Sequence, residues 1–288
     1  MSVFFCDSNC ELWWDKVEEL NIKFISMPYV LDNEVIYYDL GKNSDSKAFF
    51  EKMRKGAAPK TTALNMNDYI EYIEPVFASG EDIIYITFSH QMSGTFNSLN
   101  MALEELKTKY PDRKATVVDT KHISIAAGYV VEEAAKLHNA GKSDEEVKEF
   151  VESFREKIGC YFTISDLVYL KRGGRLTAFK AMLGTIFDLK PIVSTIDGKL
   201  DNIVKSKGRK RSLKDLCAYL EKDYVTGTEV DLSYPITILE ADSMADAEFV
   251  KENIKAKYPD AEVRIQPVGP VIGSHCGPDT IGVIFVKK

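Results

Sequence analysis

The alternation of strand-like and helix-like segments along the first half of the chain constrains its fold more than any other feature. Short apolar runs at residues 3–6, 83–86 and 115–118 have the length and composition of buried strands. Residues 98–109 and 124–138 carry apolar side chains at helical spacing. Strands that alternate with helices favour a mostly parallel sheet with helices on both of its faces.

The second half of the chain has a different pattern. Apolar runs at residues 161–164 and 191–196 predict strands, and Asp197-Gly198 directly after the second run is a hairpin signal. A helix is expected near residues 245–258, with strands on either side of it. This half therefore reads as an α+β domain with some antiparallel pairing.

The length of 288 residues is enough for two domains. We expect an α/β protein with an N-terminal domain over residues 1–160, built on a mostly parallel sheet with helices on both faces. The C-terminal α+β domain is expected over residues 161–288.

Composition excludes several function classes. The net charge of −7 argues against nucleic-acid or membrane binding by the whole surface. The five cysteines are odd in number and scattered, so we expect neither a disulfide framework nor a metal site. No run reaches about eighteen apolar residues, and no basic residue precedes Lys16, so we expect no membrane insertion, no signal peptide and a cytoplasmic location.

A polar loop follows the expected strand near residues 83–88 and precedes a helix. It contains Ser93, Gly94 and Thr95. Ligands of α/β proteins bind at the carboxyl ends of the strands, and helix N-termini offer free amides and a partial positive charge. This loop is therefore a candidate site for a carboxylate or a phosphate. The alternative is that Ser93 or Thr95 only caps the helix.

A second hydroxyl pair, Thr61-Thr62, also lies in a loop ahead of a helix. Helix capping is again the alternative interpretation, and the pair alone would not mark a site.

The C-terminal segment from Gly269 to Gly282 contains four glycines and two prolines around His275. Glycine allows close approach of the backbone to a ligand, and proline fixes φ. We predict a rigid, tight loop that presents His275 at a site. A plain turn with an incidental histidine is the alternative.

Two basic segments stand out in this acidic chain. Arg172 and Arg175 flank paired glycines, and arginine suits bidentate recognition of carboxylate or phosphate. Residues 205–214 hold six basic side chains in ten, which is either a solvated face or a docking patch for an acidic partner. Between these segments, residues 181–187 are apolar nearly all round, as in a buried helix or the lining of an apolar ligand site.

Enzymatic motifs have little support. A serine hydrolase would pair Ser93 with His275, but the nucleophile elbow needs glycine at position 91, where Gln91 stands. The phosphate-binding Gly-rich patterns of nucleotide enzymes are absent from the sequence. A hydrolase, or a binder of some anionic small molecule, remains open on the residues alone.

Taken together, these motifs resemble the DegV family of bacterial fatty-acid-binding proteins, over essentially the whole chain. The resemblance rests on their order and spacing. They are Asp7-Ser8, Thr61-Thr62, Ser93-Gly94-Thr95, Asp119-Thr120-Lys121 with Ser124 and Gly128, Leu170-Lys171-Arg172-Gly173-Gly174-Arg175, Lys190-Pro191-Ile192, and Gly269-Pro270-Val271-Ile272-Gly273 followed by His275 and Gly277-Pro278.

The resemblance implies a non-enzymatic protein with a long-chain fatty acid buried between two domains and no other cofactor. It implies a partner, a fatty acid kinase that phosphorylates the bound carboxylate to an acyl phosphate. Thr61, Thr62, Ser93 and His275 would hold the carboxylate together with the loop around Gly94 and Thr95, and the His275 loop would return to the interdomain site. The region of Arg172 and Arg175 would lie where the kinase docks.

The chain departs from the family pattern in two places. The family's Thr-Ser-x-Pro-Ser is Thr61-Thr62-Ala63-Leu64-Asn65 here, so the hydroxyl pair is kept. The usual Gly-Pro-Gly is Gly277-Pro278-Asp279. The shapes of these two loops are therefore expected to differ from the family's.

Overall fold

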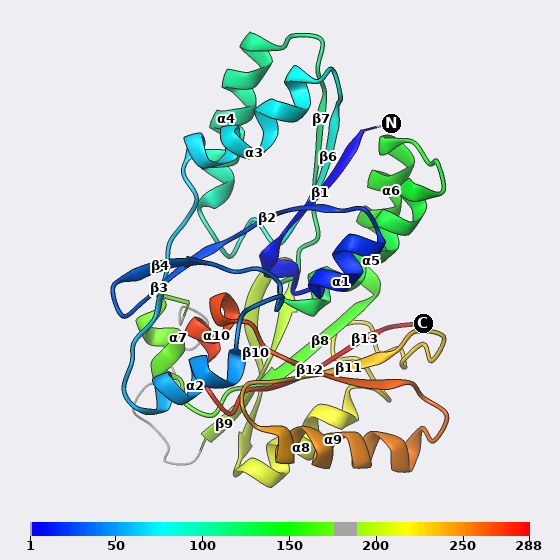
Figure 1. Cartoon of the computed structure of the whole chain (residues 1–288). Coiled ribbons are helices and arrows are strands. Elements are labelled where there is room, and N and C mark those ends of the chain that lie inside the picture. Colours follow the sequence, from blue (N-terminus) through cyan, green and yellow to red (C-terminus); the bar gives the residue numbers. More distant parts are fainter. Residues whose placement is uncertain (1, 176–188) are drawn as a thin grey trace. The chain divides into compact units, whose positions relative to one another are not determined.

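The computed structural model describes residues 2–175 and 189–288 (Figure 1). The chain forms two compact units, each with its own sheet. The first comprises Met1–Ser44 and Thr61–Glu156, and the second comprises Asp45–Lys60 and Lys157–Lys288. The expected α/β class with a parallel sheet and a separate mixed sheet is confirmed. The division into domains at residue 160 stays a prediction, and it did not foresee that the segment Asp45–Lys60 belongs with the second unit.

The first unit is built on a fully parallel four-stranded sheet in the order β2-β1-β6-β7. Every residue of β6 is buried, as its run of isoleucines predicts for a central strand. Figure 1 shows α3 and α4 on one side of this sheet and α5 and α6 on the other. The strands are β1 (Val3–Asp7), β2 (Lys23–Ile25), β6 (Ile83–Thr87) and β7 (Ala115–Asp119). The helices are α1 (Trp14–Glu19), α3 (Met66–Ala78), α4 (Thr95–Lys109), α5 (Ile125–Asn139) and α6 (Asp144–Phe154), with the short 3-10 helices η1 (Ser8–Cys10) and η2 (Arg155–Lys157).

A small three-stranded sheet, β4-β3-β5, was not predicted from the sequence. It consists of β3 (Pro28–Leu31), β4 (Glu34–Tyr37) and β5 (Lys60–Thr61). Asp32 and Asn33 join β3 to β4, and both have positive φ (53° and 65°). Asp and Asn tolerate this conformation better than most residues, and it matches the tight turns that two-residue hairpins use.

The second unit contains a six-stranded mixed sheet in the order β10-β9-β8-β13-β11-β12. The predicted hairpin at Asp197-Gly198 is present, since β9 and β10 pair antiparallel on either side of it. Leu213, Leu216 and Val250 from α8 and α9 pack into one core with strand residues of this sheet. The strands are β8 (Ile158–Thr163), β9 (Leu189–Ile196), β10 (Lys199–Lys207), β11 (Ile236–Glu240), β12 (Val263–Pro267) and β13 (Ile281–Val286). The helices are α2 (Ser46–Arg54), α7 (Val168–Arg172), α8 (Arg209–Ala218), α9 (Met244–Lys257) and α10 (Pro270–Cys276).

The prediction of a tight loop around His275 is wrong, because His275 lies on the short helix α10. The helix begins with Pro270 in its first turn, where the missing amide costs nothing, and Gly269 precedes it. Its last residue is Cys276, and Gly277, which follows it, has a φ of 75°. The glycines and prolines of this segment therefore mark the two ends of a helix.

Candidate functional site

The loop between β6 and α4 sits at the carboxyl edge of the parallel sheet, as expected. The Ser93 hydroxyl oxygen accepts a hydrogen bond from the Thr95 amide at 3.3 Å, so Ser93 does satisfy one free amide of the helix start. This bond uses one lone pair of Ser93 Oγ and leaves its proton available for an acceptor. The capping interpretation and a role in anion binding are therefore compatible.

Gly94 precedes the first residue of α4 and is exposed. Its φ of −75° is open to any residue, and a Cβ added there would meet no atom of the described residues within 4 Å. Neither backbone strain nor packing within the described chain requires glycine at this position. A bare backbone at a helix N-terminus suits close approach by an anion.

Thr95 is buried, and its hydroxyl contacts the Tyr69 hydroxyl of α3 at 3.0 Å. Tyr69 in turn hydrogen-bonds Tyr85 of β6, and the Tyr85 hydroxyl donates to Asp7 Oδ2 at 3.4 Å. A continuous polar chain thus runs beneath the loop from α4 to the end of β1. Thr95 forms the α4 end of this chain. Its hydroxyl therefore has a structural partner, Tyr69, whether or not it also contacts a ligand.

Asp7 ends β1 beside the start of the β6–α4 loop, and its side chain is fully buried. Its carboxylate accepts hydrogen bonds from the amides of Asn9 (3.0 Å) and Phe88 (3.2 Å). Burial raises the pKa of Asp7 to about 7, although the amides of Phe88 and Asn9 and the Tyr85 hydroxyl lower it. The sequence marks Asp7 only as part of a motif. Tyr69 stands among the apolar buried positions of α3, and Tyr85 stands among the isoleucines of β6. The hydroxyls of these two tyrosines were the missed signal of a buried polar chain.

The hydroxyl pair Thr61-Thr62 lies at the end of β5, in the small sheet. Thr61 is half-buried and Thr62 is exposed, and the Thr62 amide donates to the Pro28 carbonyl oxygen at 3.4 Å. The alternative that this pair caps α3 is wrong. Asn65 caps that helix, accepting from the Asp68 amide while Asp68 reciprocates at the Asn65 amide.

His275 lies against α7 within the second unit. A Cβ on Gly173 would fall 2.1 Å from His275 Nδ1, so the imidazole packs directly on the backbone at the end of α7. Burial and, to a lesser extent, the nearby Arg175 guanidinium together lower the pKa of His275 to about 4. The ring is therefore neutral near pH 7, with one N–H donor and one acceptor nitrogen.

The two predicted docking arginines flank Gly173-Gly174, and the His275 ring packs on Gly173. Arg172 ends α7, with its guanidinium 5.8 Å from the centre of the Tyr169 ring. Arg175 donates to the Gly173 carbonyl oxygen at 2.5 Å. Both side chains are exposed. The expected apolar segment at residues 181–187 lies outside the described residues.

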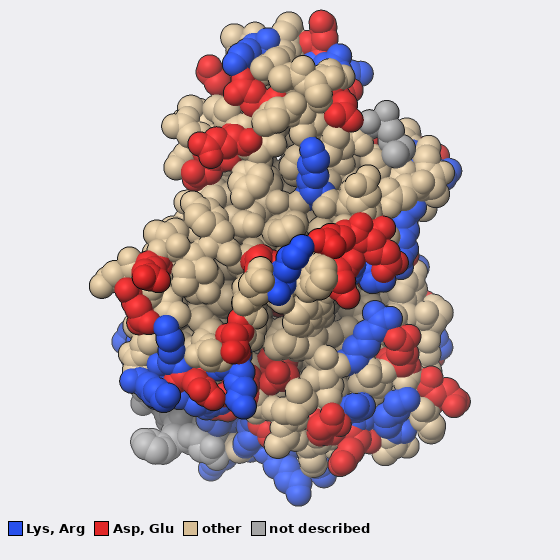
Figure 2. All heavy atoms as spheres, viewed as in Figure 1, with Lys and Arg blue, Asp and Glu red and all other residues tan. Residues whose placement is uncertain are grey.

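The basic run at residues 205–214 spans β10 and the first turns of α8 and has acidic neighbours. Arg209 donates to Asp246 Oδ2 at 2.7 and 2.9 Å, and Arg211 Nε lies 3.8 Å from Asp215 Oδ2. Figure 2 shows basic and acidic side chains intermingled on the part of the second unit in view. The run is thus a partly neutralised surface, and its proposed role in docking rests on charge density alone.

The structure brings Ser93, Gly94 and Thr95 together in the first unit, and His275, Arg172 and Arg175 together in the second. That these two groups form one site stays a prediction. His90, the histidine of the β6–α4 loop, has its Nε2 atom 2.9 Å from Thr87 Oγ1. This nitrogen therefore pairs with Thr87 rather than with Ser93, where a serine hydrolase would need its base.

Residues 2–175 and 189–288 contain neither a cluster of metal-ligand side chains nor a membrane-spanning helix. Over these ranges no three His, Cys, Asp or Glu side chains are grouped as metal ligands would be. Within the same ranges no helix has the length and apolar character needed to cross a bilayer.

Comparison with known proteins identifies relatives along the full chain. The sequence model of the DegV family, described as "Uncharacterised protein, DegV family", matches residues 3–288. A DegV domain-containing protein of Clostridium perfringens is 38% identical over 285 residues, which cover 99% of this chain and 97% of the relative.

Solved structures agree with the fold. The structure of DegV from Bacillus subtilis, described as a fatty acid binding protein, is 25% identical, covers 99% of both chains and superposes with a TM-score of 0.82. A DegV family protein from Thermus thermophilus is 24% identical, covers 100% of both chains and has a TM-score of 0.84.

Proposed function

Because the chain belongs to the DegV family, we propose that it binds a long-chain fatty acid and acts as a carrier rather than an enzyme. The observation that carries the proposal is the likeness to the Bacillus subtilis fatty acid binding protein over nearly all of both chains. The polar loop with Ser93 at a helix N-terminus supplies the anion-binding chemistry that a carboxylate head group needs.

The proposal assigns the carboxylate to Thr61, Thr62, Ser93 and the loop around Gly94 and Thr95. His275 of the second unit adds a neutral imidazole donor, and the acyl chain lies in a tunnel between the domains. Each buried methylene contributes roughly 0.8 kcal/mol, so sixteen supply on the order of 10 kcal/mol before the costs of association. The polar groups of the protein around the head group then have to hydrogen-bond the carboxylate, because an unpaired buried carboxylate is very unfavourable.

The proposal extends to a partner. In this proposal the carboxylate of the bound fatty acid lies at the polar loops. A kinase phosphorylates this carboxylate there to an acyl phosphate. The exposed Arg172 and Arg175, next to the helix that bears His275, are the proposed docking residues. In this view the protein is cytoplasmic and has no cofactor besides its ligand.

Organic extraction and mass spectrometry of the purified protein test the function. We expect one or more long-chain fatty acids in stoichiometric amount. Delipidated protein is then titrated with palmitate and with its methyl ester, which lacks the charge. A protein that yields no lipid and binds neither compound contradicts the proposal. Equal affinity for palmitate and for its methyl ester contradicts the assignment of a carboxylate-binding site.

Ser93→Ala tests the head-group assignment. Loss of one hydrogen bond to a charged group weakens palmitate binding by about 1.5–3 kcal/mol, measured by calorimetry. Ser153→Ala, an exposed serine on α6, is the matched control and leaves the affinity unchanged. Ester hydrolysis by the wild type that disappears in Ser93→Ala favours the hydrolase instead.

A further inference from the structure

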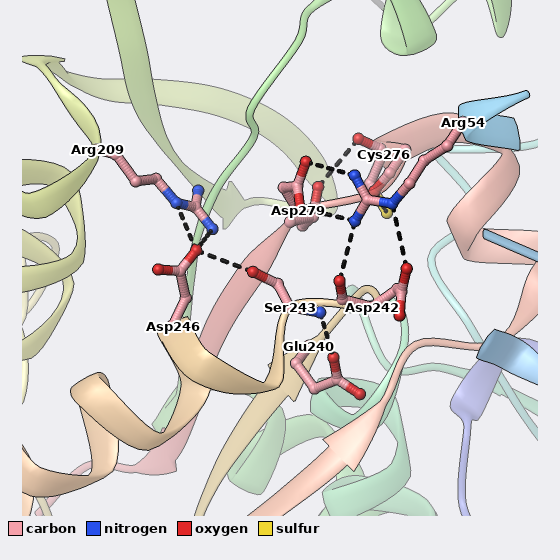
Figure 3. Close-up of polar contacts among 10 residues, drawn as sticks. Arg54, Arg209, Glu240, Asp242, Ser243, Asp246, Cys276 and Asp279 are labelled. Atoms are coloured by element: carbon pink, nitrogen blue, oxygen red, sulfur yellow. Dashed lines mark hydrogen bonds and ion pairs between the residues drawn. The ribbon is translucent and has the colours of Figure 1, made fainter. Parts of the chain in front are cut away.

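Arg54, the last residue of α2, joins two loops of the second unit that lie far away in the sequence (Figure 3). Its guanidinium donates to both carboxylate oxygens of Asp279, at 2.7 and 2.9 Å. It also donates to Asp242, at 3.1 Å to the carboxylate and 2.9 Å to the carbonyl oxygen. Planar, bidentate recognition of this kind fixes orientation as well as distance.

The two aspartates occupy strained turns that are bonded to each other. Asp242 has a φ of 54° and Asp279 a φ of 63°, a region that non-glycine residues adopt at a cost. The Asp279 amide donates to the Ala241 carbonyl at 2.8 Å, and the Ala241 amide donates to the Thr280 carbonyl at 3.0 Å. Asp279 stands where the family pattern has glycine, so this chain accepts backbone strain and gains a carboxylate for Arg54.

The clamped turn directly follows the helix that carries His275. Thr280 Oγ1 donates to the carbonyl oxygen of Cys276, the last residue of α10, at 2.9 Å. The same helix α2 reaches α10 a second time, because a Cβ on Gly273 would fall 2.7 Å from the Phe50 ring. Helix α2 therefore holds α10 through aromatic packing on its body and through Arg54 on the turn that follows it.

We propose that Arg54 is a positioning residue for His275, which it acts on through Asp279 and the turn at the end of α10. The bidentate pair keeps this short helix pressed against α7, where the imidazole rests on Gly173. The effect on ligand binding rests on the proposed function, in which His275 donates to the fatty acid carboxylate. The effect on the solvent exposure of the His275 imidazole does not depend on the proposed function.

The first test follows the four histidine rings by NMR as pH is varied. In Arg54→Ala, α10 loosens, the ring gains solvent, and the titration of His275 moves from about 4 toward its ordinary value of 6.5. Arg209→Ala, which breaks another arginine–aspartate pair of the same unit, leaves it unchanged. Asp279→Gly removes the carboxylate that Arg54 binds, while glycine suits the positive φ of this position. We therefore expect this variant to stay folded and the titration of His275 to move in the same direction as in Arg54→Ala. An unchanged His275 titration in folded Arg54→Ala and Asp279→Gly overturns the proposal.

The second test measures palmitate affinity. Arg54→Ala lowers it by at least about tenfold, in line with a lost hydrogen bond to a charged group, and Arg54→Lys restores part of it. In a His275→Ala background, Arg54→Ala causes no further loss, because the residue that it positions is gone. Losses that simply add overturn the proposal. If the wild type binds no fatty acid, the proposed function fails while the His275 titration still reports on Arg54.

Discussion

At the scale of single residues, Asp7 shows how the sheet edge handles a buried charge. Its carboxylate is fully buried and held by two backbone amides and the Tyr85 hydroxyl. Around it, β1 contributes the Cys6 thiol and α3 contributes Tyr69 behind Tyr85, and these groups are neutral near pH 7. Burial outweighs the hydrogen bonds, so the pKa of Asp7 rises to about 7.

This raised pKa predicts a pH dependence of stability. Folding raises the proton affinity of Asp7, so the unfolded chain loses this proton first, near pH 4. Between about pH 4 and pH 7 the free energy of unfolding falls by about 1.4 kcal/mol per pH unit from this group, and the fall stops above the folded pKa. Urea unfolding at several pH values measures it. Asp7→Asn removes this slope, whereas Asn in place of the exposed Asp112 keeps it. Parallel curves for Asp7→Asn and wild type contradict the assignment.

Gly173 is the second residue for which the structure makes a sharp prediction. Its φ of −75° accepts alanine, but a Cβ would overlap His275 Nδ1. Gly173→Ala therefore displaces the imidazole and costs about 1–3 kcal/mol of unfolding free energy, as overpacking does. Gly94→Ala, where the added Cβ meets no described atom, is the control and changes stability by less than about 1 kcal/mol. Equal stability of the two variants, measured by chemical denaturation, argues against the tight packing of His275.

At the scale of elements, the region around α7 and α10 is the part of the chain on which docking of the proposed kinase depends most. Arg172 is the last residue of α7 and Arg175 lies three residues beyond it, while Arg209 and Arg211 lie on α8 beside acidic residues. The first pair is therefore the better docking candidate, since α8 already pairs its charges locally.

Charge reversal at Arg172 is expected to slow acyl phosphate formation strongly and to leave palmitate affinity nearly unchanged, because surface charges chiefly control encounter and orientation. Reversal of Arg209 and Arg211 together has a smaller effect, and Lys107→Glu on α4 has none. The measurement titrates each protein against its cognate kinase at low and high salt. Rates that are equal for all variants and independent of salt would show that these arginines form only a solvated face.

At the scale of the whole molecule, the segment Asp45–Lys60 leaves its neighbours in the chain and folds with the second unit. It brings Phe50 onto Gly273 and Arg54 onto the turn at Asp279. A fragment of residues 157–288 lacks both contacts. The second unit is therefore expected to depend on a piece of the first half of the chain.

We predict that this fragment unfolds at a lower temperature than the full chain, or fails to fold cooperatively. A synthetic peptide of residues 45–60 raises its midpoint in circular dichroism, because it binds only the folded form. The same peptide with Phe50→Ala and Arg54→Ala does not. A fragment that melts like the full chain, with or without peptide, contradicts this dependence.

The sequence by itself determined the parts of the protein that depend on neighbouring residues. The alternating apolar periods predicted the parallel sheet of the first unit, and Asp197-Gly198 predicted the β9–β10 hairpin of the second. The loop with Ser93 was predicted as a helix start after a strand. The helix α10 also had a local signal, with Gly269-Pro270 before it and Gly277 after it, but the same residues read equally well as a loop.

Only the tertiary structure decided what depends on residues that are distant in the chain. Arg54 meets Asp279 across 225 positions, and Asp7 meets Phe88 across 81. No periodicity records such pairs, because they arise when separate elements pack together. The raised pKa of Asp7 and the lowered pKa of His275 follow from the same cause, since burial is a property of the packed molecule and not of the sequence around either residue.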